Sequence, residues 1–197
     1  MTDIRKALEL KAEAFTSAKI SSDIPRIYVA CLASYNNGFL YGKWIDANQS
    51  EDEILASVQV MLAASPVTKL YGEVSEEWAI HSYEGFQGVE ISEYESFAKV
   101  AELAQELEEH GEPYAAYLDY FFDGTVADFE EKYRGCFENK EDFAYSLYDE
   151  MGTIQQLEKA GLNPSYIDFS AIARDLFIDG YTAIEKGYKK CYVFADY

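Results

Sequence analysis

The sequence of 197 residues predicts an α+β fold. Strand-like segments lie at residues 26–45 and 77–83, amphipathic helices fill residues 92–152, and a β-hairpin is expected at residues 181–194. Hydrophobic residues make up 49% of the chain and aromatic residues 16%, which is enough for a sizeable core. Acidic residues are concentrated in residues 73–158. This stretch also contains aromatic residues, so we expect it to fold as well.

The first folded unit is expected over residues 26–91. Residues 26–33 are rich in Ile, Val, Leu and Tyr, and residues 39–45 form a second strand after the turn signal Asn36-Asn37-Gly38. Ser50, with a glutamate three residues later, predicts a capping box at the start of a helix. Residues 1–25 precede this unit as an N-terminal extension, in which apolar spacing predicts an amphipathic helix.

The acidic middle of the chain is predicted to be helical. Ser92, again with a glutamate three residues later, predicts the start of its first helix. Apolar residues recur on one side of that helix: Phe97, Val100, Leu103, Ala104 and Leu107. A stripe of acids is expected on the opposite side, formed by Glu95, Glu102, Glu106 and Glu109. Like charges at this spacing destabilise a helix without helping it to fold, so the stripe is either a solvated helix face or a surface that a partner binds.

Short helices are predicted to follow. Pro113 is well placed to begin a second helix and Gly124 to end it, and Thr125 can cap a third. Asn139 caps a fourth helix, which Gly152 ends.

The last third of the chain is expected to return to mixed structure. Asn163 and Pro164 predict the start of a helix that runs to about Ile178. The final hairpin would pair residues 181–184 with residues 191–194 around a turn at Glu185-Lys186-Gly187.

The charge of the chain is concentrated in one stretch. Residues 73–158 contain 23 Asp and Glu but only four Lys and Arg, so they hold −19 of the formal net charge of −20. Residues 1–72 contain eight acids and seven bases, and residues 159–197 contain five of each. Such a surface attracts cationic partners and repels nucleic acid. Proteins that bind duplex DNA accept roughly one negative charge per 1.7 Å, so this pattern favours a protein that imitates DNA.

Other classes of protein have less support. Cys31, Cys136 and Cys191 form no CxxC pair and have no neighbouring histidine to suggest a metal site, and they are expected to be reduced, mostly buried thiols. The start of the chain has no apolar leader, and no stretch reaches the roughly 18 apolar residues of a membrane span, so a cytoplasmic protein without membrane contact is expected. Neither histidine lies in a catalytic motif, which argues against an enzyme or a cofactor.

One calcium-binding pattern competes with these interpretations. Asp119, Asp123 and Glu130 occupy positions 1, 5 and 12 of an EF-hand loop. Phe121 stands at position 3 without an oxygen ligand, and no second loop is present to pair with this one. Helix termini with capping acids are the better explanation, and no metal is expected.

Three separated segments resemble the ArdA antirestriction proteins. They read IYVACLASYNNGFLYGKWID at residues 27–46, EEWAIHSYEGF at residues 76–86 and YIDFSAIARDL at residues 166–176. Their order and spacing also match. Members of that family are encoded on conjugative plasmids and transposons, and the resemblance implies an elongated, three-domain, dimeric mimic of bent B-form DNA that blocks type I restriction-modification enzymes.

By this resemblance the chain has an α+β domain at residues 26–93, an acidic helical domain at 94–134 and an α+β dimerisation domain at 135–197. Residues 1–25 have no obvious counterpart in the family. The partner is then the DNA-binding groove in the specificity and methyltransferase core of a type I enzyme, and the protein forms a homodimer through its C-terminal domain. An acidic adaptor or chaperone for basic nucleoid proteins is the alternative.

The carboxylates expected to take the place of DNA phosphates belong to the predicted acidic helices. They are Glu95, Glu102, Glu106, Glu109, Asp119, Asp123, Asp128, Glu130, Glu131, Glu138, Glu141, Asp142, Asp149 and Glu150.

Overall fold

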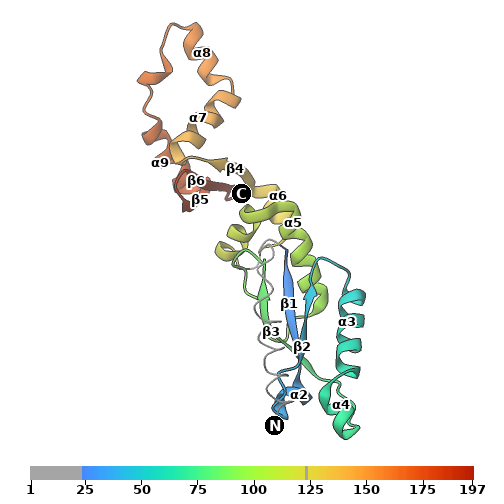
Figure 1. Ribbon diagram of the computed structural model, residues 1–197. Helices are drawn as coiled ribbons and strands as arrows, with labels where there is room; N and C mark the ends of the chain where they lie inside the picture. Colours follow the sequence, from blue (N-terminus) through green and yellow to red (C-terminus); the bar gives the residue numbers. More distant parts are fainter. Residues whose placement is uncertain (1–23, 123) are drawn as a thin grey trace. The chain divides into compact units, whose positions relative to one another are not determined.

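The computed structural model describes residues 24–122 and 124–197, so the helix predicted within residues 1–25 lies almost wholly outside the described part (Figure 1). The chain divides into two compact units, with the boundary between Glu109 and His110. Each unit contains a three-stranded antiparallel sheet together with helices. The predicted α+β class is confirmed. The division into three domains at residues 26–93, 94–134 and 135–197 stays a prediction.

The sheet of the first unit has the order β2-β1-β3. Strand β1 lies in the centre, and its Ile27 and Val29 are fully buried. Its strands are β1 (Arg26–Cys31), β2 (Gly42–Asp46) and β3 (Trp78–Glu84). The predicted first strand is shorter than expected, because residues Leu32–Asn36 form the short helix α2, whose first turn is capped by the Cys31 thiol.

Helices α3 (Glu51–Ala63) and α4 (Pro66–Tyr71) follow β2 (Figure 1). The capping box predicted at Ser50 is confirmed, whereas α4 was not predicted. By length and composition alone, Glu51–Tyr71 could cross a membrane. The stretch is broken into two helices, and α3 buries Ile54 and Val58 completely within its unit, as a core helix of a folded domain does.

Helix α5 (Phe97–Tyr120) spans the boundary between the units and is broken at Gly111 (φ 63°, ψ −150°). The predicted start at Ser92 is wrong. The helix begins at Phe97, and Ser96 caps it, because the Ser96 Oγ accepts a hydrogen bond of 3.3 Å from the Lys99 N–H. The break at Gly111 restarts the helix just before Pro113, where a second helix was predicted, and this second part ends at Tyr120, earlier than Gly124.

The sheet of the second unit has the order β4-β6-β5. Its strands are β4 (Tyr133–Phe137), β5 (Tyr181–Gly187) and β6 (Lys190–Ala195). The predicted hairpin is confirmed, with its turn at Tyr188 and Lys189 instead of residues 185–187. Strand β4 was not predicted, since its partner β6 lies far away in the sequence.

The remaining helices of the second unit are α6 (Val126–Lys132), α7 (Lys140–Glu150), α8 (Thr153–Lys159) and α9 (Phe169–Asp179). The caps predicted at Thr125 and Asn139 are confirmed. The helix predicted from Asn163 is wrong at its start. Pro164–Tyr166 form only a 3₁₀ turn, η1, and α9 begins after Asp168, whose carboxylate accepts a hydrogen bond from the Ala171 N–H.

All three cysteines are free thiols in the structure. Cys31 and Cys191 are buried, as expected, whereas Cys136 is exposed on β4.

Candidate partner-binding surface

The acidic stripe on α5 is smaller than the sequence predicted. Glu102 and Glu109 are exposed, and neither forms a hydrogen bond or ion pair within the described residues. Glu106 is half-buried and interacts with neighbouring groups. Glu95 precedes the helix, and its Oε2 lies 3.4 Å from the Nζ of Lys99. Only Glu95 lies outside α5, so the helix carries three of the four predicted residues, and their contact with a partner stays a prediction.

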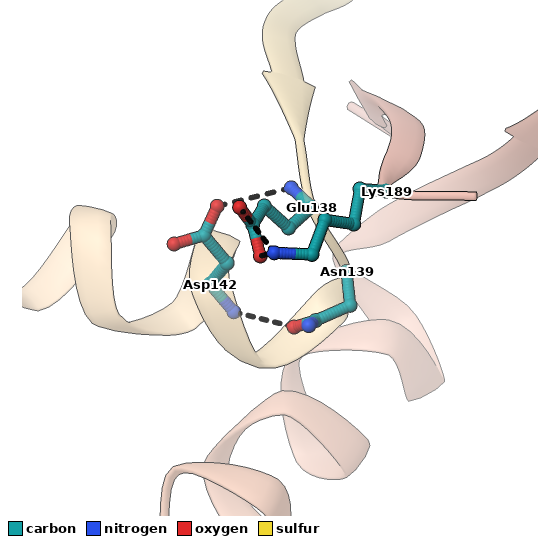
Figure 2. Close-up of polar contacts among 4 residues, drawn as sticks. All are labelled: Glu138, Asn139, Asp142 and Lys189. Atoms are coloured by element: carbon teal, nitrogen blue, oxygen red, sulfur yellow. Dashed lines mark hydrogen bonds and ion pairs between the residues drawn. The ribbon is translucent and has the colours of Figure 1, made fainter.

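Two predicted contact residues, Asp128 and Asp142, also form hydrogen bonds at the starts of helices α6 and α7 in the second unit. The Asp128 carboxylate accepts hydrogen bonds from the Thr125 hydroxyl (2.6 Å) and the Thr125 N–H (3.2 Å). These bonds favour the charged form and lower the pKa of Asp128. The Asp142 carboxylate accepts a hydrogen bond of 3.0 Å from the Glu138 N–H, while the Asp142 N–H donates to Asn139 Oδ1 at 2.8 Å (Figure 2).

Three carboxylates of the second unit form ion pairs with lysines of the β5–β6 hairpin. Asp119 Oδ2 lies 3.0 Å from Lys186 Nζ, and Glu138 Oε2 lies 2.8 Å from Lys189 Nζ. Glu112 pairs with Lys190. The hydrogen bond from Lys190 lowers the pKa of the Glu112 carboxyl, and the same bond raises the pKa of Lys190.

The other candidates in the second unit differ in how free they are. Glu130 Oε1 lies 3.8 Å from His110 Nε2, a pair that is ionic only when the histidine is protonated. Asp149 accepts a hydrogen bond of 2.5 Å from Gln155. The carboxylates that are exposed without a partner among the described residues are Glu131, Glu141 and Glu150. Asp123 lies outside the described residues.

The calcium-loop pattern finds a different use in the structure. Asp119 lies near the end of α5 and binds Lys186, and Glu130 lies on α6 near His110. A helix begins at Val126 and is capped by Thr125, so residues from Thr125 onward have helical or capping geometry. Of the acids in this pattern, Asp119 pairs with Lys186 and Glu130 lies near His110, whereas the acid that takes part in a cap is Asp128.

Sequence reasoning missed two acids that make defined contacts. Glu112 binds Lys190, and Glu108 accepts a hydrogen bond from the Asn48 side-chain amide. Both contacts join residues at least 60 positions apart, so no local pattern could have indicated them. The excess of acids was visible in the sequence, but the division into paired and free carboxylates was not.

The sequence model of the family described as antirestriction protein (ArdA) matches residues 27–190 of the chain. The chain belongs to the ArdA family. A search of curated proteins finds no match. Membership of the ArdA family implies an antirestriction function, exerted by an inhibitor on restriction-modification enzymes. The match to ArdA begins at Ile27, so the N-terminal extension lies outside it, and it ends within β6, whose last residues complete the second sheet.

Proposed function

We propose that this ArdA-family protein imitates B-form DNA and inhibits type I restriction-modification enzymes by occupying their DNA-binding groove. The observation that carries the proposal is the concentration of −19 formal charges in residues 73–158, a stretch that folds into helices and strands with exposed carboxylates. Charge on a fixed scaffold can match a fixed array of Lys and Arg side chains, which a disordered acidic tail cannot do.

The mechanism requires no chemical reaction. A restriction-modification enzyme presents Lys and Arg side chains where DNA phosphates bind, and carboxylates at those positions form charge-assisted hydrogen bonds with them. Exposed groups such as Glu102, Glu109 and Glu141 are available for this purpose. Because carboxylates imitate phosphates and not base edges, inhibition is expected to be broad across recognition sequences.

The experiment is a competition assay. A type I methyltransferase core is saturated with fluorescent duplex DNA, and the protein is added while fluorescence anisotropy is recorded. A DNA mimic displaces the duplex with a defined stoichiometry. An acidic adaptor for basic nucleoid proteins leaves the enzyme–DNA complex intact, and that result would reject the proposal.

We also propose that the protein is a homodimer through residues 135–197. This part carries a balanced charge after residue 158, so like-charge repulsion is small there. It also exposes large apolar side chains, among them Met151 (66%), Leu162 (56%) and Tyr166 (85%). Contact with a second copy of the chain would remove these apolar side chains from water.

Sedimentation equilibrium tests the dimer. The double variant Leu162→Glu/Tyr166→Glu is expected to shift the protein to a monomer, because two charges would be buried in the interface. The double variant Val60→Glu/Val74→Glu is the control, since it adds the same charge at two exposed apolar residues of the first unit. Equal association of both variants would exclude this patch from the interface, and a monomeric wild type would exclude the dimer.

A further inference from the structure

The β5–β6 hairpin supplies three lysines that each face a carboxylate from an earlier part of the second unit. Their partners come from three different places: the start of the second part of α5, its end, and the segment between β4 and α7. The pairs are Lys190 with Glu112, Lys186 with Asp119, and Lys189 with Glu138. These three lysines lie within five consecutive residues, so one hairpin neutralises acids separated along the chain.

The best-defined of these pairs is formed by Lys189 and Glu138 (Figure 2). The ammonium lies 3.0 Å from one carboxylate oxygen and 2.8 Å from the other, so it binds both. The backbone of Glu138 is itself held, because its N–H donates to the carboxylate of Asp142 at the start of α7. The Glu138 side chain therefore extends from a backbone that is held by a hydrogen bond. Its two carboxylate oxygens can bind one cation together, as they bind the Lys189 ammonium.

The backbone of Lys189 gives a second sign that its side chain matters. Its φ of 56° lies in the left-handed region, which Gly, Asn and Asp adopt more readily than lysine. Glycine, asparagine or aspartate would adopt this backbone at a lower cost. Lysine at this position supplies the ammonium that reaches Glu138.

The three pairs are open to solvent. Side-chain exposure is 33% and 73% for Lys186 and Asp119, 50% and 53% for Lys189 and Glu138, and 41% and 44% for Lys190 and Glu112. Exposed ion pairs contribute little to stability, and a competing cation can replace one partner. Arginine is the stronger competitor, because its planar guanidinium binds both oxygens of a carboxylate.

We propose that Glu112, Asp119 and Glu138 are contact points for arginine and lysine side chains of the target enzyme, and that the hairpin lysines occupy these points until the target displaces them. The inference rests on the proposed function and adds to it. It assigns Glu112 to the binding surface, and it makes Lys186, Lys189 and Lys190 internal competitors that weaken inhibition.

The test compares two triple variants in the duplex-displacement assay at about 50 mM salt. The hairpin variant is Lys186→Gln/Lys189→Asn/Lys190→Gln, with asparagine chosen because it tolerates the left-handed turn. The control variant is Lys43→Gln/Lys69→Gln/Lys159→Gln, which replaces three exposed lysines that make no ion pair within the described residues. Both remove three positive charges, so the general change in charge is the same.

The hairpin variant is expected to displace DNA at about tenfold lower concentration than the control variant, since three exposed pairs of a few tenths to about 1 kcal/mol each would no longer compete. The difference should shrink as salt is raised. Equal potency of the two variants would overturn the inference. Weaker displacement by the hairpin variant, with an unchanged melting curve, would also overturn it.

A double-mutant cycle covers the case in which the triple variant folds poorly. Glu138→Gln is measured alone and together with Lys189→Asn. Its loss of potency should be several-fold larger in the Lys189→Asn background, where the carboxylate is free, and equal losses would contradict the inference. Wild-type protein that fails to displace DNA rejects the proposed function and this inference together, whereas displacement by the wild type with equal variants rejects the inference alone.

Discussion

The rings of Tyr117 and Phe194 lie 5.3 Å apart between centroids, so that α5 and β6 meet in the core of the second unit. Phe194 is fully buried, and its ring also contacts those of Phe129 and Tyr133. The chain therefore builds this unit around aromatic rings contributed by α5, α6, β4 and β6. Rings of this kind bury much area and pair in tilted or edge-to-face geometry.

The first prediction concerns this aromatic core. Phe194→Ala is expected to lower the free energy of unfolding by about 3–5 kcal/mol, because it leaves a cavity among rings that cannot move together fully. Urea denaturation followed by circular dichroism measures the change. Tyr188→Ala is the control, since Tyr188 is 91% exposed in the hairpin turn, and it should change stability by less than about 0.5 kcal/mol. Similar losses for both variants would contradict the role of Phe194.

The second prediction separates crowding from backbone strain in the first unit. Gly85 (φ 82°) and Gly38 (φ 80°) have nearly the same left-handed backbone, so alanine costs a similar amount of conformational energy at both. A Cβ at Gly85 would lie 2.4 Å from the carbonyl oxygen of Ile24, whereas a Cβ at Gly38 would meet nothing within 4 Å. Gly85→Ala should therefore lower the melting temperature clearly more than Gly38→Ala, and equal shifts would show that the contact at Ile24 is absent.

The third prediction concerns the pH dependence of the cap on α6. The fold lowers the pKa of Asp128 below its ordinary value of 3.8, chiefly through the hydrogen bond from the Thr125 hydroxyl. A carboxyl group whose pKa is lowered by folding stabilises the folded state at pH values above its pKa in the unfolded chain. This stabilisation is lost as the pH falls through its pKa in the folded protein. The melting temperature of Thr125→Val should lie below that of wild type at pH 7, and the difference should shrink below about pH 4.

Ser92→Ala is the matched control for this cap, because Ser92 was predicted to cap a helix that Ser96 caps in the structure. It should leave the melting temperature unchanged at every pH. A constant difference between wild type and Thr125→Val from pH 7 to pH 2 would show that Asp128 is not coupled to the cap.

The fourth prediction tests the free carboxylates on α5. Glu102→Gln/Glu109→Gln should raise the inhibitor concentration needed for half-maximal DNA displacement several-fold, because two unpaired anions of the contact surface are lost. Asp179→Asn/Glu185→Gln removes the same charge at two exposed acids outside the stretch of residues 73–158. If both variants lose potency equally, only the total charge matters and these two positions are not contacts.

The fifth prediction concerns salt. Association driven by opposite charges should weaken as ions screen the field, so the inhibition constant should rise between 50 and 300 mM salt. Titrations of the same enzyme at a series of salt concentrations measure the change. Equal inhibition constants across this range would show that electrostatic attraction does not control binding.

Local signals in the sequence predicted the parts of the fold that depend on a few neighbouring residues. The capping boxes at Ser50 and Thr125 and the cap at Asn139 were found because their hydrogen bonds join residues three positions apart. The same rule failed at Ser92, which has Glu95 three residues later but does not begin the helix, whereas Ser96, which has Lys99 at that position, caps it. The capping-box pattern alone therefore does not identify the residue at which a helix begins.

Elements that depend on distant partners were missed. Strand β4 has five residues and contains a glycine, so it has little strand character until it pairs with β6. The candidate surface shows the same limit. Composition located the charge, but the pairing of Glu112, Asp119 and Glu138 with hairpin lysines depends on contacts across at least 51 positions of sequence.

Some carboxylates of this protein already bind a backbone N–H at the start of a helix or a lysine of the β5–β6 hairpin. This affects how members of the family should be compared. An isoelectric point weights every acid in the same way, whether it already binds a neighbouring amide, as Asp142 does, or faces water, as Glu141 does. Two homologues with the same isoelectric point can therefore offer a target quite different numbers of available anions. To rank homologues by inhibitory potency, one must count the exposed carboxylates that form no hydrogen bond or ion pair within the protein.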